Sequence, residues 1–448
     1  MNALLRATHN LQTIDTIKQT GFVLRISGNI IESTGPNANI GEICAILRAG
    51  GAHLGYAEVI GFRRNTLILM PLHELENIGP GALVRKHGTA SHAMVGEALV
   101  GRIINAMGEP IDGQGPIVAD ERRNISSTPP NPLQRKPVSD FFETGVRAMD
   151  GFLSMGRGQR IGIMAGSGVG KSVLLGMISR YSSADINVIA LIGERGREVS
   201  EFLARDLGED GLAKSVVIVV TSDEMPLMRR RGALLATTVA EYFRDKHKDV
   251  ILLMDSLTRV AMAQREIGLA VGEPPTTKGY TPSTFSLLPK LLERAGNGIE
   301  GSITAIYTVL VENDDMDDPI GDAARGILDG HIVLSRNLAS RGYFPAIDIL
   351  QSVSRLMAVV TSQEHQEAAQ KIRDLIATYN QAEDLINIGA YVEGSNPKID
   401  SARKYIDEIK VILQQGTHEK TRYEDLLKVI GYFKNASSQP KPQQHNQN

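Results

Sequence analysis

The segment AGSGVGKS at residues 165–172 constrains the fold of this chain more than any other. An apolar run, RIGIM, precedes it, and KSVLLGMISR, a stretch with helical character, follows it. A glycine-rich turn between a buried strand and a helix is typical of a phosphate-binding loop, in which backbone N–H groups and a helix N-terminus converge on an anion. Ala165 replaces the usual first glycine, at a position that begins the turn and need not approach phosphate.

The residues of this segment have distinct expected roles. Lys171 is placed to reach the β- and γ-phosphates of a nucleotide, and the Ser172 hydroxyl is placed to bind Mg²⁺. Backbone N–H groups supply most of the other phosphate contacts. We therefore expect the nucleotide-binding residues to be Gly166, Ser167, Gly168, Val169, Gly170, Lys171, Ser172 and Val173.

A second motif supports a metal–nucleotide site. In VILLMDSLTR, residues 250–259, an apolar run leads directly to Asp255. A carboxylate at the end of a strand beside the phosphate-binding loop can hold Mg²⁺, usually through water. Many strands end in Asp, so this motif is informative because the loop accompanies it.

The stretch LIGERGREVSEFL at residues 191–203 places charges directly after an apolar strand. If the sheet is parallel, Glu194 lies near the γ-phosphate and can polarise an attacking water. Arg195 and Arg197 would then offset the negative charge of phosphates and carboxylates. The alternative is a solvated helix start, because acidic residues are favourable near a helix N-terminus.

Strands and helices alternate from about residue 158 onward. This alternation predicts an α/β core, a parallel sheet covered by helices on both faces. The expected strands are 160–164, 187–192, 215–220, 250–254, 303–309 and 331–335. The expected helices are 171–182, 195–207, 233–247, 256–270 and 285–295.

The segments that flank this core differ from it in character. Short β-rich runs separated by Gly, Pro and Asn predict a small barrel or sandwich before the core, and amphipathic stretches predict helices after it. We therefore expect an N-terminal docking helix at 1–20, a β-barrel domain at 21–92, the α/β domain at 93–360, a helical domain at 361–438 and a disordered tail at 439–448.

Composition excludes several classes of protein. A net charge of −3 argues against a general nucleic-acid binder. The apolar runs are too short to cross a bilayer, and the N-terminus has no apolar region typical of a secretory signal, so we expect a cytoplasmic protein. The single cysteine, Cys44, lies in the run EICAIL, which favours a buried structural thiol.

Several long segments resemble the catalytic-subunit family of F-type rotary ATPases, and most closely its flagellar protein-export branch, which serves type III secretion. They include PPNPLQRKP, TGVRAMDGFLSMGRGQRIGIMAGSGVGKS, IGERGREV, MDSLTRVAMAQREIGLAVGEPPTTKGY and ILDGHIVLSRNLASRGYFPAIDILQSVSR. The resemblance covers roughly residues 21–438. It implies a β-barrel, a RecA-like P-loop core, a helical C-terminal domain and a ring of six identical subunits that hydrolyses ATP with Mg²⁺.

The resemblance also implies roles for single residues. Glu194 would activate water, and Arg195 and Arg259 would lie near the γ-phosphate. Glu198 would belong to the Mg²⁺ water shell, with Ser172 and Asp255 as the other metal residues. Phe344 would stack on adenine; the alternative is an ordinary buried Phe. Arg355 would reach the γ-phosphate of a neighbouring subunit; the alternative is a surface ion pair.

Partners follow from the same resemblance. The acidic segment NDDMDDP at 313–319 resembles a loop that meets a central stalk, although acidic loops are usually just solvated. The apolar spacing within 1–20 favours docking to a regulatory protein or a membrane surface over a frayed terminal helix. Export substrates, chaperones and a membrane export gate would be the other partners, at the inner face of the cytoplasmic membrane, with no nucleic acid.

The same motifs also occur in proteins with other functions, and these alternatives stay open. A virulence-type secretion ATPase would share all the chemistry, and an ATP synthase catalytic subunit would alternate with a second chain. An RNA translocase would need a basic, aromatic N-terminal domain, whereas 21–92 holds only Phe22, Phe62 and Tyr56 as aromatic residues. The guanine signature of small GTPases is missing from the sequence, and a non-catalytic ring subunit would lack Glu194.

Overall fold

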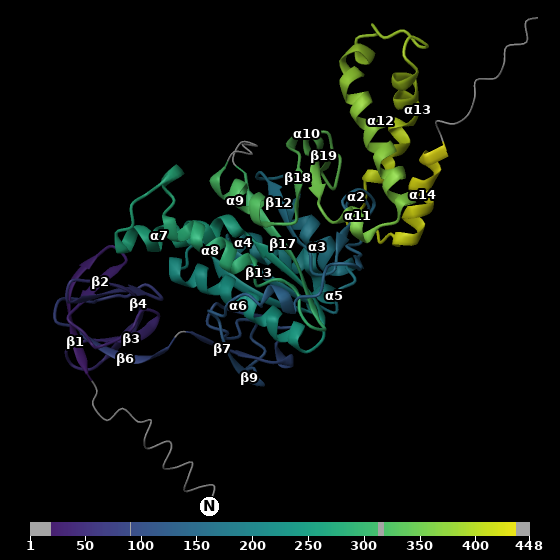
Figure 1. Cartoon of the computed structure of the whole chain (residues 1–448). Coiled ribbons are helices and arrows are strands. Elements are labelled where there is room, and N and C mark those ends of the chain that lie inside the picture. The colour runs from purple at the N-terminus through teal and green to yellow at the C-terminus, as the bar shows by residue number, and fades with distance from the viewer. Residues whose placement is uncertain (1–18, 90, 312–317, 436–448) are drawn as a thin grey trace, which may run out of the picture.

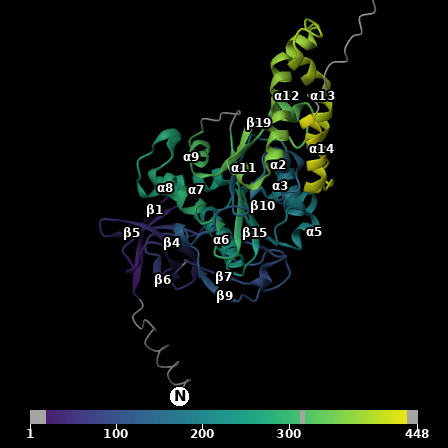
Figure 2. The same ribbon diagram turned by 45° about the vertical axis from the view of Figure 1, so that its right-hand side comes forward.

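The computed structural model describes residues 19–89, 91–311 and 318–435. Figure 1 shows a β-barrel near the N-terminus, a central sheet covered by helices, and a helical extension at the C-terminal end. In Figure 2 the same extension again projects away from the sheet. Within the described ranges, no helix is long and apolar enough to cross a membrane. The predicted tail, and all of the predicted N-terminal helix except its end, lie outside these ranges.

Six antiparallel strands close the barrel. Alternate side chains point inward, and apolar residues such as Val23, Ile46, Val59 and Val84 fill the interior. Cys44 is buried among them, and burial raises the pKa of its thiol to about 11, so the expected structural thiol is confirmed. In spatial order the strands are β1 (Thr20–Ser27), β2 (Ile30–Ser33), β5 (Thr66–Pro71), β4 (His53–Arg63), β3 (Glu42–Leu47) and β6 (Leu83–Thr89).

The segment between barrel and core is held by buried arginines. Arg294 is 1% exposed, forms an ion pair with Glu241 at 2.6 Å and donates to the carbonyl of Ile125 at 2.7 Å. Arg231 donates to the carbonyls of Ala106 and His92 at 3.0 Å. Small elements complete this segment: β7 (His92–Val95), η1 (Glu97–Leu99), β9 (Glu121–Asn124), η2 (Pro132–Gln134), β10 (Phe141–Phe142), α2 (Arg147–Phe152) and β11 (Met155–Gly156).

The central sheet follows the order β19-β18-β12-β17-β15-β13-β14-β8. Every neighbouring pair on this path is parallel except β18 and β19. The predicted α/β core with a parallel sheet is therefore confirmed. The strands are β8 (Ile103–Ile104), β12 (Arg160–Ala165), β13 (Ile186–Glu194), β14 (Ser215–Thr221), β15 (Asp249–Asp255), β17 (Ser302–Leu310), β18 (Gly330–Leu334) and β19 (Ile347–Ser354), with β16 (Gly296–Asn297) beside β17.

Two apolar layers sandwich the sheet. Val188 and Ala190 of β13 belong to one layer, whereas Ile189 and Leu191 belong to the other, because successive side chains of a strand point to opposite faces. The first layer contains α6 (Pro226–Asp245), α7 (Leu257–Val271) and α8 (Pro282–Leu292). The second contains α3 (Lys171–Tyr181), α4 (Gly196–Glu201), the π-helical segment η3 (Phe202–Leu207) and α5 (Gly208–Leu212).

Three of the differences from the predicted elements have a clear cause in the sequence. Helix α6 begins at Pro226 and not at 233, because the polar run after this proline hides its apolar face. Strand β19 is half exposed and pairs antiparallel with β18, so it lacks the continuous apolar run of its neighbours. Strand β8 has only two residues, too few for a periodic signal.

Three helices form the C-terminal extension and share the second apolar layer through Ile372, Tyr405 and Phe433. The buried His365 fixes their base: its Nε2–H donates to the carbonyl of Gly151 at 2.7 Å, and its Nδ1 lies 2.9 Å from the Tyr423 hydroxyl. The helices are α12 (Gln363–Asn387), α13 (Pro397–Leu413) and α14 (Tyr423–Asn435). Short helices precede them: η4 (Thr277–Gly279), α9 (Pro319–Ile327), α10 (Arg336–Ser340) and α11 (Met357–Val360).

Candidate active site

The loop at 166–170 connects the end of β12 to the first residue of α3. Gly168 and Gly170 have φ of +77° and +88°, which residues with a side chain rarely adopt. A Cβ atom on Gly168 would meet no heavy atom within 4 Å, so the backbone there faces open space. The loop thus presents bare backbone N–H groups at the start of a helix, as the binding of phosphate requires.

Three charged side chains meet beside this loop. The Nζ atom of Lys171 lies 2.5 Å from Asp255 Oδ1 and 3.1 Å from Glu194 Oε1. Their side chains are 13%, 4% and 15% exposed, respectively. Burial disfavours the ammonium, but the two carboxylates outweigh burial and hold the pKa of Lys171 above its ordinary value. Sequence reasoning predicted all three residues, and the structure brings them together.

Gly193 explains how Glu194 reaches this cluster. The pairing of β13 with β14 shifts between Ile192 and Glu194, and Gly193 adopts a φ of +75°. A Cβ atom there would lie 2.8 Å from Cβ of Arg259, the third residue of α7. Glycine therefore permits both the turn and the close approach of α7, which places Arg259 next to the strand that carries Glu194.

Thr308 is a member of the site that the sequence did not reveal. It is fully buried on β17, and its hydroxyl donates to Asp255 Oδ1 at 2.7 Å. A threonine within the apolar run SITAIYTVL reads as an ordinary strand residue. The one indication that could have identified Thr308 is that a hydroxyl buried within an apolar strand needs a hydrogen-bond partner. Thr308 fixes the Asp255 carboxylate from β17, the strand that lies between β12 and β15 in the sheet.

The residues present fit Mg²⁺ that arrives with a nucleotide. Ser172 is partly exposed at the start of α3, and Asp255 ends β15, where it contacts Lys171, the residue before Ser172. Across the described ranges, no group of three or more His, Cys, Asp or Glu residues could hold a metal by itself. A small donor set of this kind suits Mg²⁺, which keeps several waters and takes phosphate oxygens as ligands.

Arg195 and Glu198 do not join this cluster in the isolated chain. Arg195 is the N-cap of α4 and its side chain is 79% exposed. It pairs with Glu198 at 3.5 Å, and Glu198 is itself 47% exposed. Arg197 is also exposed and pairs with Glu201 at 2.7 Å. The start of α4 is therefore solvated here, as the alternative interpretation of this stretch expected.

Phe344 lies against the end of the P-loop. A Cβ atom on Gly170 would approach its ring carbons at 3.4 Å, and the Phe344 side chain is 45% exposed. The carbonyl of Phe344 accepts from the backbone N–H of Gln415 at 3.0 Å. The Gln415 side chain is buried and donates to the carbonyl of Gly145 at 2.8 Å. An exposed aromatic ring beside the loop fits a base-stacking role, and the ordinary buried Phe is excluded.

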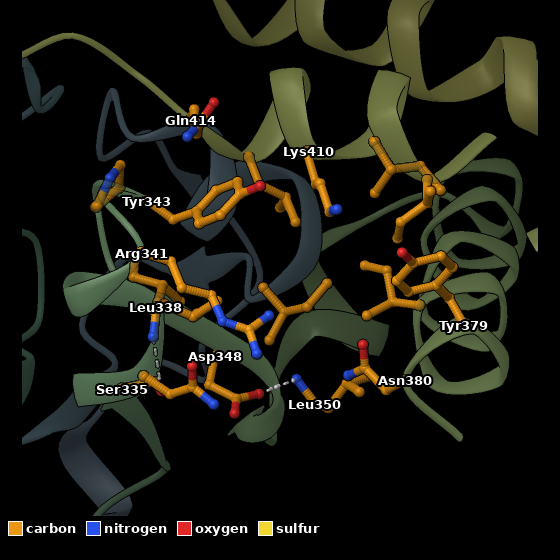
Figure 3. A pocket seen from close by; sticks show the side chains of 18 of the residues that line it. Ser335, Leu338, Arg341, Tyr343, Asp348, Leu350, Tyr379, Asn380, Lys410 and Gln414 are labelled. Carbon is orange, nitrogen blue, oxygen red and sulfur yellow. Dashed lines mark hydrogen bonds between the residues drawn. The ribbon is translucent and has the colours of Figure 1, made fainter. Parts of the chain in front are cut away.

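A cavity of about 350 Å³ lies next to Phe344 in the chain, since Tyr343 and Pro345 line it. Figure 3 shows Tyr343, Tyr379 and Lys410 around this cavity. Tyr343 and Tyr379 line it, and the Lys410 ammonium lies 5.9 Å and 5.2 Å from their ring centres, respectively. The cavity separates the core from α12 and α13, and none of the predicted site residues lines it. It is therefore distinct from the P-loop site.

Arg355 lies at the opposite edge of the sheet. Its backbone N–H donates to the carbonyl of Asp329, whose own N–H donates to the carbonyl of Arg160, the first residue of β12. The P-loop follows the last residue of β12, Ala165, so the two sites are about 17 Å apart at about 3.3 Å per strand residue. The exposed Arg355 guanidinium donates to the carbonyl of Arg325 at 3.1 Å. It therefore cannot reach the P-loop of its own chain.

The predicted stalk loop is only partly visible. Of the segment 313–319, the residues up to 317 lie outside the described ranges. Asp318 caps α9 by accepting from the N–H groups of Ile320 and Gly321 at 2.9 Å and 3.2 Å. The stalk contact therefore stays a prediction.

The chain matches known protein families and individual relatives. Residues 145–354 match the model of the ATP synthase alpha/beta family, nucleotide-binding domain, and residues 361–430 match the T3SS EscN ATPase C-terminal domain. The chain is 51% identical over 421 residues to the flagellum-specific ATP synthase of Bacillus subtilis, which covers 94% of this chain and 96% of that one.

Two further relatives come from type III secretion. The type 3 secretion system ATPase of Xanthomonas euvesicatoria is 46% identical over 420 residues, with 94% of this chain and 95% of the other covered. A solved structure of the assembled ATPase EscN in complex with its central stalk EscO, from enteropathogenic E. coli, matches with a TM-score of 0.85. That match has 46% identity and covers 92% of this chain and all of the other.

Proposed function

Because this chain belongs to the ATP synthase alpha/beta family, we propose that it hydrolyses ATP to drive or assist protein export through a type III secretion apparatus of the flagellar kind. The resemblance seen in the sequence is confirmed by the family models and by relatives that align over nearly the whole chain. One observation carries the proposal. Lys171, Glu194 and Asp255 converge beside a bare phosphate-binding backbone at the carboxyl edge of the sheet.

Hydrolysis adds water to the γ-phosphorus and breaks its bond to the terminal oxygen of ADP. The loop backbone and Lys171 bind the phosphates, and the Glu194 carboxylate orients the water and accepts its proton. Without nucleotide, Glu194 accepts a hydrogen bond from Lys171 at 3.1 Å. An incoming phosphate competes for the same ammonium, so substrate binding itself frees Glu194 to act on water.

Mg²⁺ would be held by the Ser172 hydroxyl and, through water, by Asp255, and it would neutralise phosphate charge there. Arg259 lines the cavity beside the loop and is placed to stabilise charge on the γ-phosphate. Arg195 and Glu198 contribute only if nucleotide or a neighbouring subunit draws the start of α4 inward. Phe344 supplies the surface on which the base stacks.

The working form is a ring of six identical chains in which Arg355 acts on a neighbour. Its position at the opposite edge of the sheet supports action in trans, because it cannot reach the P-loop of its own chain. A guanidinium at the neighbour's γ-phosphate would stabilise the charge that grows in the transition state. Hydrolysis would then depend on assembly.

The other partners would be components and cargo of the type III secretion apparatus. A central stalk protein would meet the interior of the ring, and a regulatory protein would bind the N-terminal segment. Export substrates, their chaperones and a membrane export gate would bring the ring to the inner face of the cytoplasmic membrane. The second candidate is a virulence-type secretion ATPase, because relatives of both kinds align with similar identity, 51% and 46%. Motility and secretion of a deletion strain would separate the two.

A subunit-mixing experiment tests the ring chemistry. Glu194→Gln and Arg355→Ala subunits should each be nearly inactive as pure rings. Mixed rings should regain activity, because some junctions pair an intact Glu194 with a neighbour's intact Arg355. Native mass spectrometry would show that the rings are mixed. A lack of recovery in such rings would assign Arg355 to its own subunit or to no catalytic role.

A further inference from the structure

Gln159 is a buried polar residue directly before β12, the strand that leads to the P-loop. Its Oε1 accepts from the backbone N–H of Gly156 at 2.8 Å, and because a backbone N–H can only donate, this contact fixes the orientation of the amide. Its Nε2 then donates to the carbonyl of Asp329 at 3.1 Å and to the Ser354 hydroxyl at 3.0 Å. Gln159 therefore ties the start of β12 to the residue before β18 and to the last residue of β19.

Both groups that Gln159 binds are also joined to Arg355. Ser354 precedes Arg355 in the chain, and the Asp329 carbonyl accepts from the Arg355 backbone N–H at 3.0 Å as well as from Gln159. The Ser354 hydroxyl donates its own hydrogen to the carbonyl of Ser154 at 2.7 Å, so it can only accept from Gln159. The backbone of Arg355 is thus held through two neighbours that share one buried amide.

The space around Arg355 leaves room for its backbone to move. Arg355 lines a cavity of about 280 Å³ that is also bordered by residues of β19, α11 and α12. The residue is exposed, and its guanidinium donates to the backbone carbonyl of Arg325 at 3.1 Å. A guanidinium at the end of a long side chain follows any shift of its backbone. Hydrogen bonds to the flanking residues, more than close packing, therefore determine where this guanidinium lies.

We propose that Gln159 is a positioning residue for Arg355. Through Ser354 and Asp329 it holds the Arg355 guanidinium where the γ-phosphate of the neighbouring subunit requires it. The proposal rests on the function proposed above, in which Arg355 acts on a neighbour. A charge that stabilises a transition state must be placed accurately, and a displacement of about 1 Å can lower the rate about a hundredfold.

The competing interpretation places the effect of Gln159 in the P-loop of its own chain. Strand β12 runs from Arg160 to Ala165, and the P-loop follows its last residue. A disturbance at Gln159 would have to pass along a strand that is paired with β17 on one side and with β18 on the other. The contacts toward Arg355 are direct, which favours an effect on Arg355 over an effect on the P-loop.

Mixed rings distinguish the two interpretations. Gln159→Met keeps about the size of the side chain and removes its amide, and Ser354→Ala removes the hydroxyl that the amide binds. Pure rings of either variant should bind MgATP as wild type does and hydrolyse it about ten- to a hundredfold more slowly. Mixed with Glu194→Gln subunits, which keep an intact Arg355, either variant should exceed the mean activity of the two pure rings. Mixed with Arg355→Ala subunits, neither variant should do so.

Ser352→Ala is the matched control on the same strand. Ser352 is fully buried, and its hydroxyl donates to the carbonyl of Asp348 at 2.5 Å and accepts from the N–H of Val333 at 2.9 Å. The substitution removes a buried hydroxyl from β19 but leaves the partners of Arg355 in place. Ser352→Ala rings should hydrolyse ATP at the wild-type rate. Circular dichroism and native mass spectrometry would show that each variant folds and that the rings are mixed.

The outcomes separate this proposal from the function on which it rests. Wild-type turnover by Gln159→Met, or by Ser354→Ala if Gln159→Met does not fold, would overturn the proposal. Recovery with Arg355→Ala in place of Glu194→Gln would also overturn it, because the defect would then lie in the P-loop of the variant chain. The mixture of Glu194→Gln with Arg355→Ala is the reference. If the reference recovers and the Gln159→Met mixture with Glu194→Gln does not, the proposal alone fails. If the reference does not recover, action of Arg355 on a neighbour is rejected, and the proposal falls with it.

Discussion

At the scale of single residues, Lys171 is shared between two states of the site. Without nucleotide its single positive charge offsets part of the charge of Asp255 and Glu194, two carboxylates that lie close together and are largely buried. With nucleotide the same ammonium serves the phosphates. In the proposed cycle, the same side chain therefore serves negatively charged groups in both states, and substrate replaces the carboxylates as its main partner.

We expect Glu194→Gln to bind MgATP normally and to hydrolyse it at least about a hundredfold more slowly, the usual size of a general-base effect. The amide keeps the size of the side chain but cannot accept a proton from water. Single-turnover hydrolysis and titration with a fluorescent nucleotide separate the two properties. Turnover within about threefold of wild type would remove Glu194 from the role of base.

We expect Lys171→Ala to lose nucleotide-dependent turnover and assembly, because the γ-phosphate loses its main protein cation. Circular dichroism would show that the variant folds, and analytical ultracentrifugation with ATP would report assembly. Lys290→Ala, on the exposed face of α8, is the control. Wild-type activity of Lys171→Ala would refute the assignment of the phosphate-binding loop.

The residue-level predictions from sequence succeeded where a motif fixes the chemistry. Lys171, Glu194 and Asp255 follow apolar strands whose ends must meet in a parallel sheet, so their convergence could be predicted. Thr308 could not, because a threonine inside a strand gives no signal beyond β propensity. The exposed position of the Arg195 guanidinium could not be predicted either, because the spacing of residues does not determine where a side chain points at the start of a helix.

At the scale of elements, the sequence predicted the fully buried strands of the sheet but not the strands at its edges. Strands such as β13 and β15 are buried on both faces and therefore read as continuous apolar runs. Strand β19 lies at the edge with one side half exposed, and its pattern is mixed. The helices that pack on one side only, such as α12, showed the expected period.

The base of α12 should be sensitive to acid. Burial lowers the pKa of His365, although the hydrogen bond to Gly151 opposes this shift. The unfolded chain then binds a proton more readily than the folded one, so stability is complete above the ordinary imidazole pKa of about 6.5 and is lost as pH falls below it. Acidification should weaken the docking of the helical extension first.

Thermal unfolding from about pH 7.5 to about pH 5.5, on either side of the ordinary imidazole pKa, tests this expectation. The loss of melting temperature on acidification should be smaller in His365→Gln, whose side chain does not titrate. His418→Gln changes an exposed histidine of the same extension and should keep the wild-type slope. An equal slope in His365→Gln would assign the acid sensitivity to other groups.

At the scale of the whole molecule, described residues from Thr20 onward form the barrel and connect it to the core. Strand β1 begins at Thr20 and pairs with both β2 and β6, so the barrel closes from that residue onward. The barrel is tied to α6 by an ion pair between Glu58 and Arg230 at 2.8 Å. These barrel strands and this contact with the core all lie in described residues that begin at Thr20, the last residue of the predicted docking helix.

Deletion of residues 1–18 should leave basal ATPase activity largely intact and weaken binding to a regulatory partner or to anionic vesicles. Turnover assays and vesicle flotation measure the two effects. Removal of residues 439–448 is the matched control, since it shortens the other end by a polar segment. Unchanged binding after the N-terminal deletion would favour a frayed terminal helix.

The separation of Glu194 and Arg355 across one sheet has an arithmetic consequence. Under the proposed function, each active site forms at a junction between two chains, and each chain contributes half of two different junctions. An open row of chains has one junction fewer than it has members, and a single chain has none. Closure of the row therefore creates a working site without adding any material. Damage to one junction would inactivate the site at that junction and leave the other sites intact. Activity should therefore be proportional to the number of intact junctions and not to the number of chains.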